Sequence, residues 1–273
     1  MMRTWRLRDR QVELGTRVQL MGVVNVTPDS FSDGGRYLAP DQALMQAEEL
    51  VAEGVAIVDL GGESTRPGYQ PVAEDVEWER IRPVLQGLMH LGASVSVDTQ
   101  KAEVARRALD HGAHIINDIS GLADASMADV LADYGAGYVL MYNTADMAPT
   151  PISSRAIRPW LEERLERLER AGVASTQIVV DPGLGFAYGV EENWDVLHDL
   201  EVLRGLGAGL LVGPSRKRFL GQVTGRPPED RDVATAALAA LLVGKGVDIL
   251  RVHQVAMVKD AVRVAERWAK RSG

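Results

Sequence analysis

Short apolar runs alternate along the chain with longer stretches in which apolar residues recur at helical spacing. The short runs are rich in Val, Ile and Leu, as expected of parallel strands buried on both faces, and regular alternation of this kind predicts a parallel β-sheet. The predicted strands are Val18–Val24, Val55–Leu60, Ala93–Val97, His114–Asp118, Tyr138–Met141, Ile178–Asp181, Leu210–Gly213 and Ile249–Val252. The predicted helices are Gln42–Ala52, Val76–Leu91, Glu103–Leu109, Trp160–Ala171, Trp194–Leu203, Val233–Val243 and Val258–Trp268.

Polar residues follow nearly every predicted strand at its carboxyl end. A closed barrel brings all these ends to one face, whereas an open doubly wound sheet gathers only those beside its switch point. The pattern favours an α/β fold of the (β/α)8 TIM barrel type, a single domain over residues 1–273 with a short N-terminal extension at about 1–17. The polar residues are Asn25, Glu63, Asp98, Asn117, Asp181, Ser215, Arg216, Lys217, Arg251 and His253.

Composition narrows the possible functions. The chain has 273 residues, the size of one such barrel, and its formal net charge of -8 argues against a nucleic-acid partner. It has no cysteine, so disulfides, thiolate metal sites and a cysteine nucleophile are excluded. No stretch has the length and apolarity of a signal peptide or membrane span, so we expect a cytoplasmic protein without a membrane partner. Asn143–Ser154 is expected to be a mobile loop.

Several familiar motifs are absent or incomplete. Gly213-Pro214-Ser215-Arg216-Lys217 has lysine where a nucleophile elbow needs its second glycine. There is no P-loop and no His-Glu-x-x-His, and Gly183-Leu184-Gly185 lacks the third glycine of a dinucleotide fingerprint. Nucleotide and zinc chemistry are therefore not predicted.

Asp98, Asn117 and Asp181 each close a different predicted strand. Each alone could be the N-cap of the following helix, but three buried together would need donors, and a fused heterocycle rich in N–H groups would supply them. Lys217 and Arg216 could be solvated surface charges, although their place directly after a buried strand favours a functional role.

Arg251 and His253 alternate at the end of the last predicted strand, so their side chains share a face. In a closed barrel Asn25 of the first strand lies beside them, and together they could form an anion pocket. His253 could equally be a hydrogen-bonded structural histidine. Asn25 is a plausible ligand for Mg²⁺, which uses few protein ligands and is completed by water and phosphate oxygens.

Two long runs resemble signatures of the dihydropteroate synthase family. They are Met21-Gly22-Val23-Val24-Asn25-Val26-Thr27-Pro28-Asp29-Ser30-Phe31-Ser32-Asp33-Gly34-Gly35 and Asp59-Leu60-Gly61-Gly62-Glu63-Ser64-Thr65-Arg66-Pro67-Gly68. Shorter runs around Asp98, Asn117, Asp181, Lys217 and Arg251 follow in the family's order. The resemblance implies a (β/α)8 barrel that joins 6-hydroxymethyl-7,8-dihydropterin diphosphate to 4-aminobenzoate, releasing pyrophosphate, with Mg²⁺ as cofactor.

The resemblance also implies residue roles. Asp98, Asn117, Asp181 and Lys217 would hold the pterin ring with Met141 packed on it, while Arg251, His253 and Asn25 would hold the diphosphate, Asn25 through Mg²⁺. The residues expected to act catalytically are Asn25, Asp98, Lys217, Arg251 and His253. Further substrate-binding residues are expected at Thr27, Pro28, Phe31, Thr65, Arg66, Pro67, Phe186, Arg218 and Val252.

Four positions depart from the family pattern: Tyr142, Tyr188, Arg218 and Gln254 stand where His, Lys, Ser and Asp are common. These departures keep open a pterin-binding paralogue without turnover. A pterin-dependent methyltransferase barrel is the other alternative, against which the run from Asn25 to Gly35 argues. The uncharged helix Val233–Val243 predicts a homodimer, because an outer barrel helix normally presents charges to water.

Overall fold

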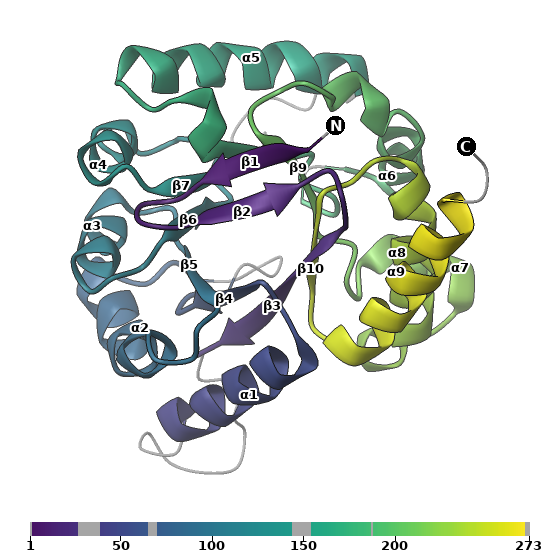
Figure 1. The fold of residues 1–273 in the computed structure, drawn as a ribbon, viewed down its shortest axis with the longest axis horizontal. Coiled ribbons are helices and arrows are strands. Elements are labelled where there is room, and N and C mark those ends of the chain that lie inside the picture. Colours follow the sequence, from purple (N-terminus) through teal and green to yellow (C-terminus); the bar gives the residue numbers. More distant parts are fainter. Residues whose placement is uncertain (1, 27–38, 65–69, 144–153, 187, 271–273) are drawn as a thin grey trace.

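The computed structural model describes residues 2–26, 39–64, 70–143, 154–186 and 188–270. Eight parallel strands close into a barrel in the order β10-β3-β4-β5-β6-β7-β8-β9 (Figure 1). All eight predicted strands are confirmed, and the expectation of a closed barrel is correct. The strands are β3 (Gln19–Asn25), β4 (Ile57–Gly61), β5 (Ser94–Asp98), β6 (Ile115–Asp118), β7 (Gly137–Met141), β8 (Ile178–Asp181), β9 (Gly209–Val212) and β10 (Ile249–Val252).

Helices surround the barrel, and every predicted helix is present. The prediction Trp194–Leu203 covers two elements, the end of α6 and a 3₁₀ turn at Leu200–Leu203. Two further helices, α4 and α7, are too short to show a clear apolar period in the sequence. The helices are α1 (Ala39–Glu53), α2 (Glu74–Leu88), α3 (Ala102–Asp110), α4 (Met127–Tyr134), α5 (Ser154–Arg170), α6 (Val190–His198), α7 (Arg218–Thr224), α8 (Asp232–Gly244) and α9 (Val255–Ala269).

The strand register sets polar residues of successive strands at one level. Asn25 of β3 pairs with Gly61 of β4, Gly61 pairs with Asp98 of β5, and Asp98 pairs with Asn117 of β6. At their other ends these strands begin with the uncharged residues Gln19, Ser94 and Ile115, so the row of Asn25, Asp98 and Asn117 lies at the carboxyl end of the barrel. This is the end at which barrel enzymes carry their sites.

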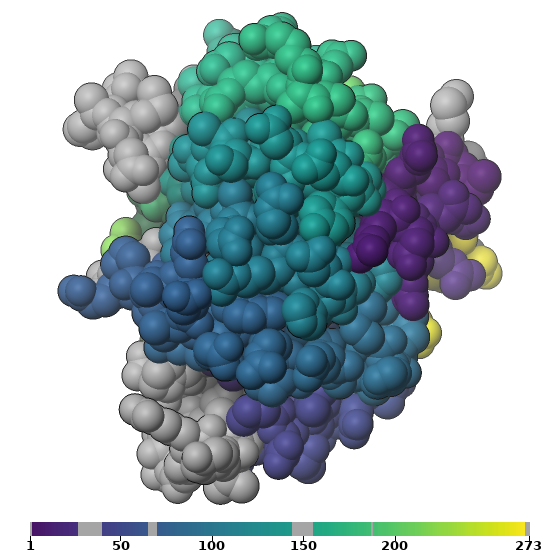
Figure 2. Space-filling model, turned by 90° about the vertical axis from the view of Figure 1, so that its left-hand side faces the viewer, coloured from purple at the N-terminus to yellow at the C-terminus, as the bar shows by residue number. Residues whose placement is uncertain are grey.

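An antiparallel hairpin closes the opposite end of the barrel. Its strands are β1 (Arg3–Arg6) and β2 (Gln11–Leu14), and it lies across the barrel mouth in Figure 1 and at one side of the molecule in Figure 2. Trp5 and Leu14 are fully buried in a cluster with barrel residues such as Met21 and Ile249. The segment looks polar in the sequence because its inward apolar residues alternate with outward charged residues, and this alternation was not recognised as a pair of strands.

No helix within the described residues is long and apolar enough to cross a membrane. The cytoplasmic location expected from the sequence stays a prediction.

Candidate active site

Arg251 lies at the centre of a buried cluster of carboxylates at the carboxyl ends of the strands. Its Nε donates to Asp59 Oδ2 over 2.6 Å, and its Nη2 donates to Asp98 Oδ2 over 2.8 Å. Asn117 Nδ2 donates to the same Asp59 oxygen over 3.1 Å. Burial opposes the charge of Arg251, yet the two carboxylates raise its pKa, so the guanidinium stays charged.

Asp59 was not among the predicted site residues. It lies inside β4 between Val58 and Leu60, and its side chain is fully buried in the barrel interior. Sequence reasoning looked for polar residues after strands, whereas this carboxylate lies two residues before a strand end. An aspartate within an otherwise apolar strand was the available signal, because a buried carboxylate needs a cationic partner elsewhere.

Asp98 has a titration range far from that of a surface aspartate. Burial raises its pKa to about 7, while Arg251 counteracts the shift and Asp59 adds to it. The alternative that Asp98, Asn117 and Asp181 are N-caps is wrong. The N-caps of α3, α4 and α6 are Lys101, Ser126 and Gly189, and none of the three strand-end residues caps a helix.

Lys217 and Asp181 form the opposite wall of the cluster. Burial lowers the pKa of Lys217 to about 8, although Asp181 favours its charged form. The ammonium lies 4.3 Å from the ring centroid of Phe186, and its stem lies against Gly185, where a Cβ would be 2.9 Å from Lys217 Cδ. Burial raises the pKa of Asp181 to about 6 despite a hydrogen bond from the amide of Gly183. Between about pH 6 and pH 8 the carboxylate of Asp181 and the ammonium of Lys217 are both charged.

His253 is held by Ser215. The Ser215 hydroxyl lies 2.9 Å from His253 Nδ1, and the backbone amide of His253 donates to the same hydroxyl over 3.3 Å. Burial, with Arg251 nearby, lowers the pKa of His253 to about 4, so the ring is neutral at neutral pH. A hydroxyl that donates to Nδ1 leaves the proton on Nε2, which can then donate to an anion.

Asn25 completes the row next to Asp98. Its Oδ1 would lie 3.1 Å from a Cβ at Gly61, so the missing side chain of Gly61 makes room for the amide. A single amide oxygen next to an anion pocket suits Mg²⁺, which takes hard oxygen ligands and completes its shell with water and phosphate. Within the described ranges no cluster of three acidic or histidine side chains could form a metal cage. The residues therefore fit a metal shared with substrate.

Comparisons with known proteins agree with this geometry. A family profile described as "Pterin binding enzyme" matches residues 21–253. Dihydropteroate synthase of Bacillus subtilis is 42% identical over 261 residues, which are 93% of this chain and 90% of the relative. The chain belongs to the dihydropteroate synthase family.

Solved structures of the family superpose closely. Dihydropteroate synthase of Xanthomonas albilineans with 4-aminobenzoic acid has a TM-score of 0.92 at 36% identity, covering 100% of this chain and 99% of that one. The Thermus thermophilus enzyme in complex with 6HMPPP has a TM-score of 0.85 at 41% identity, covering 97% and 99%. The resemblance read from the two signatures is confirmed.

Glu63, in the second family signature, belongs to a buried network that was not predicted from the sequence. Lys101, the N-cap of α3, donates to Glu63 after β4 and to Glu77 on α2. Glu63 in turn accepts from the amide of Val72. Burial raises the pKa of Glu77, while Lys101 opposes the shift. The network joins Glu63 and Val72 to α2 and to the start of α3.

The remaining family positions divide into three groups. Met141 and Val252 are buried at strand ends, next to Asp181 and Arg251 respectively. Arg218 is exposed at the start of α7, and Arg216 points away from the cluster into a two-bond ion pair with Asp232. The predicted residues Thr27, Pro28, Phe31, Thr65, Arg66 and Pro67, and most of the loop Asn143–Ser154, lie outside the described residues.

Two of the four departures from the family pattern are in contact. The rings of Tyr142 and Tyr188 stack 6.0 Å apart, and Trp160 meets Tyr142 edge-on at 4.9 Å. Tyr188 donates to the carbonyl of Pro182 over 2.5 Å, so this aromatic group supports the turn that carries Asp181. The two tyrosines therefore form one stacked unit next to the turn after Asp181. Gln254 is exposed before α9.

Proposed function

We propose that the protein condenses 6-hydroxymethyl-7,8-dihydropterin diphosphate with 4-aminobenzoate, giving 7,8-dihydropteroate and pyrophosphate in folate biosynthesis. The observation that carries this proposal is the buried set Asp98, Asn117 and Asp181 facing Lys217 and Arg251 in a chain of this family. The complexes of the Xanthomonas and Thermus relatives support the same pair of substrates.

The cluster has the donors and acceptors that a reduced pterin requires. Carboxylates of Asp98 and Asp181 can accept from ring N–H and amino groups, and Asn117 can both accept and donate. Lys217 can donate to the ring carbonyl oxygen. A hydrogen bond to a charged group contributes about 1.5–3 kcal/mol, so a few such contacts suffice for micromolar binding.

The leaving group would be held on the Arg251 side of the cluster. Neutral His253 would donate from Nε2 to a diphosphate oxygen, and Arg251 adds a permanent positive charge. We propose that Asn25 binds Mg²⁺ together with the diphosphate. When bound, the metal would neutralise part of the charge that develops on the departing diphosphate.

The reaction follows from these positions. The bond between the pterin methylene carbon and the diphosphate oxygen breaks, and the electron pair leaves with the diphosphate. The carboxylates of Asp98 and Asp181 stabilise positive charge on the pterin in a site shielded from water. The amino nitrogen of 4-aminobenzoate then forms the new C–N bond and releases one proton.

A direct assay tests the proposal. Purified protein with Mg²⁺, the dihydropterin diphosphate and labelled 4-aminobenzoate should form labelled dihydropteroate. Lys217→Ala should lose pterin affinity by about 10–1000-fold, because a charged hydrogen bond in a shielded site costs roughly 2–4 kcal/mol to remove. Lys245→Ala is the matched control, because Lys245 follows α8 and lies outside the carboxylate cluster, and it should bind as the wild type does. Pterin binding without product would indicate a binding paralogue.

We further propose that the protein is a homodimer built on α8 and α9. Val233, Ala237 and Leu241 form an exposed apolar row on α8, and Val264 and Trp268 are exposed on the adjacent α9. Leu241 and Trp268 are 71% and 78% exposed, which is unusual for such large apolar side chains unless a partner covers them. A second copy related by a two-fold axis is the commonest occupant of such a face.

Sedimentation of single variants tests this interface. Leu241→Glu and Ala237→Glu should convert dimers to monomers at micromolar concentration. Met45→Glu is the matched control, because Met45 is 61% exposed on α1, away from α8. A monomeric wild type would refute the dimer, and an unchanged dimer in both α8 variants would show that the interface lies elsewhere.

A further inference from the structure

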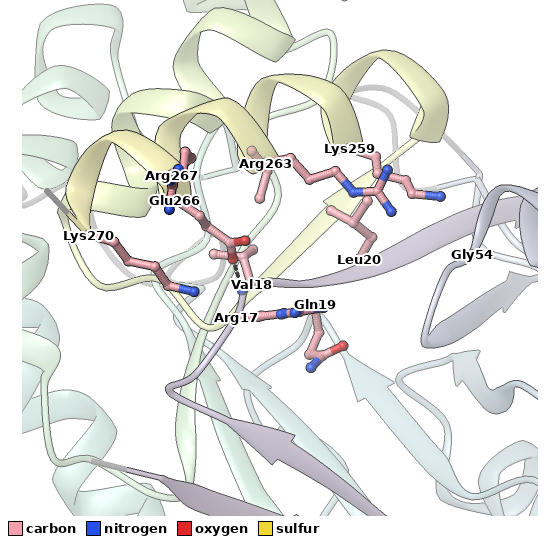
Figure 3. A pocket seen from close by; sticks show the side chains of 11 residues that line it. Arg17, Val18, Gln19, Leu20, Gly54, Lys259, Arg263, Glu266, Arg267 and Lys270 are labelled. Atoms are coloured by element: carbon pink, nitrogen blue, oxygen red, sulfur yellow. Dashed lines mark hydrogen bonds between the residues drawn. The ribbon is translucent and has the colours of Figure 1, made fainter.

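A second concavity lies at the amino end of the barrel, on the opposite side from the carboxylate cluster. It has a volume of about 350 Å³ and is formed by the start of β3, the turn at Gly54 and the face of α9 next to β3 (Figure 3). The buried side chains of Leu20 and Val262 form its floor. The volume is that of a site for a small organic molecule.

The walls of this basic groove are strongly positive. Its charged lining side chains are five cations and one carboxylate, namely Arg17, Lys259, Arg263, Arg267, Lys270 and Glu266. Glu266 is already engaged, because its Oε1 accepts from the amide of Val18 over 2.7 Å. This concentration of cations occurs in a chain whose formal net charge is -8.

Most of these cations have no ion-pair partner in the part of the chain that the structure describes. Within the described residues, Arg17, Arg263, Arg267 and Lys270 make no ion pair. Elsewhere on the described surface an arginine can have acidic partners, as Arg107 has in Asp75 and Glu103. Like charges gathered around one groove repel each other, and a bound anion would relieve that repulsion.

Helix electrostatics explain only part of the cluster. Arg267 and Lys270 lie at the last turn of α9, where cations complement the helix dipole. Arg263 and Lys259 lie in earlier turns, beyond the reach of that effect. Lys259 bonds the carbonyl of Glu53, and its Nζ lies 3.1 Å from where a Cβ at Gly54 would be, so the glycine makes room for the ammonium.

We propose that the basic groove binds a small molecule carrying two or more phosphate groups. Arg17, Arg263 and Arg267 have the planar guanidinium that pairs with phosphate through two bonds, and the lysines add point charges. The apolar floor suits a compact organic part of the same molecule. This site is separate from the proposed pyrophosphate-releasing centre, so its existence does not depend on the synthase activity.

Counting binding sites by calorimetry with inorganic tripolyphosphate tests the proposal. Arg263→Glu/Arg267→Glu should remove one site per chain relative to the wild type, or weaken it about tenfold or more, because like charges placed next to an anion are strongly unfavourable. Arg6→Glu/Arg226→Glu is the matched control, since it changes the net charge equally at exposed positions away from the groove. The control should keep every site.

Two further measurements sharpen the outcome. Synthase turnover of the groove variant should stay at the wild-type level, which shows that the lost site is not the catalytic one. Citrate at equal ionic strength should bind at least tenfold more weakly than tripolyphosphate if phosphate is the recognised group. Equal site counts and affinities in the groove variant and its control would overturn the proposal, as would tighter binding of an RNA oligonucleotide than of tripolyphosphate through the same residues.

Discussion

The two ends of the barrel treat positive charge in opposite ways. At the carboxyl end half-buried Arg251 is bound to the buried carboxylates of Asp59 and Asp98. At the amino end Arg263 and Arg267 are exposed and have no anionic partner among the described residues. The difference shows what each environment permits, because a buried charge must be paired within the protein, whereas water tolerates an unpaired one.

The same elements connect the two ends. β3 begins at the basic groove and ends at Asn25, and α9 begins directly after the segment that carries Arg251 and His253 and then runs along the groove. The carboxyl end, where Arg251 is paired with Asp59 and Asp98, is called the paired end, and the amino end with the groove cations is called the unpaired end. The paired end has the fixed geometry that suits one ligand. The unpaired end has cations on flexible side chains, which suits a ligand held mainly by charge.

The largest expected effect comes from breaking the paired end. Arg251→Met should lower the free energy of unfolding by about 3–5 kcal/mol, because it leaves buried carboxylates without their cation. Activity should fall with it. Urea denaturation measures the first effect. In the folded variant the buried carboxylates keep their protons up to a higher pH than in the unfolded chain, where they ionise near pH 4. The free energy of unfolding should therefore fall as pH rises from about 4 to 7. A pH-independent loss would contradict this explanation.

Trp5→Ala should cost about as much stability, roughly 3–5 kcal/mol, without changing substrate affinity. Trp5 is fully buried under the barrel, and its indole nitrogen donates to the carbonyl of Gln177 over 2.7 Å. Trp5→Phe keeps most of the apolar volume and should cost only a fraction of that amount. The hairpin lies at the opposite end of the barrel from the carboxylate cluster. A marked rise of KM for either substrate in folded Trp5→Ala would therefore contradict the view that the two ends act independently.

The architecture was predictable because apolar runs and helical periodicity depend on local sequence. The strands Ile178–Asp181 and Ile249–Val252 have the predicted boundaries. The hairpin at Arg3–Leu14 was not predicted, because four-residue strands with a polar or charged residue at every second position look like a polar tail. Its inward apolar residues can be recognised as core residues only once the open end of the barrel, against which they pack, is known.

The candidate site was predictable as a set of residues but not as a network. Strand-end polarity and the family signatures found Asp98, Lys217 and Arg251, while the resemblance divided them between ring and diphosphate. The structure joins these roles, since Arg251 bonds Asp98 directly. Asp59 and Lys101 were not predicted because their charged partners are 192 and 24 or more residues away, and spatial pairing of that kind has no local signal.

Catalysis should follow a bell-shaped pH profile set by the paired end. Asp181 and Asp98, with pKa values raised by burial to about 6 and about 7, are ionised only above those values. Lys217, with its pKa lowered by burial to about 8, is protonated only below that value. We expect kcat/KM for the pterin diphosphate to be highest between about pH 7 and 8. It should fall about tenfold per pH unit above pH 8 and between pH 7 and 6, and about a hundredfold per unit below pH 6, where both carboxylates take up protons.

Lys217→Arg separates the two limbs of this profile. An arginine stays protonated throughout, so the alkaline limb should move up or vanish while the acid limb keeps its place. If the alkaline limb stays near pH 8 in this variant, the titrating group responsible for that limb is not Lys217.

The smallest effect is expected at the unpaired end. Arg263→Met and Arg267→Met should change the free energy of unfolding by no more than about 0.5 kcal/mol, as is usual for exposed positions. The sign should be favourable at low salt, because each substitution removes repulsion among the groove cations, and the gain should disappear near 1 M salt as the charges become screened. Urea denaturation of both variants at low and high salt measures it. A loss of stability that salt does not alter would mean that these arginines have partners inside the protein, and the contrast between the two ends of the barrel would then be wrong.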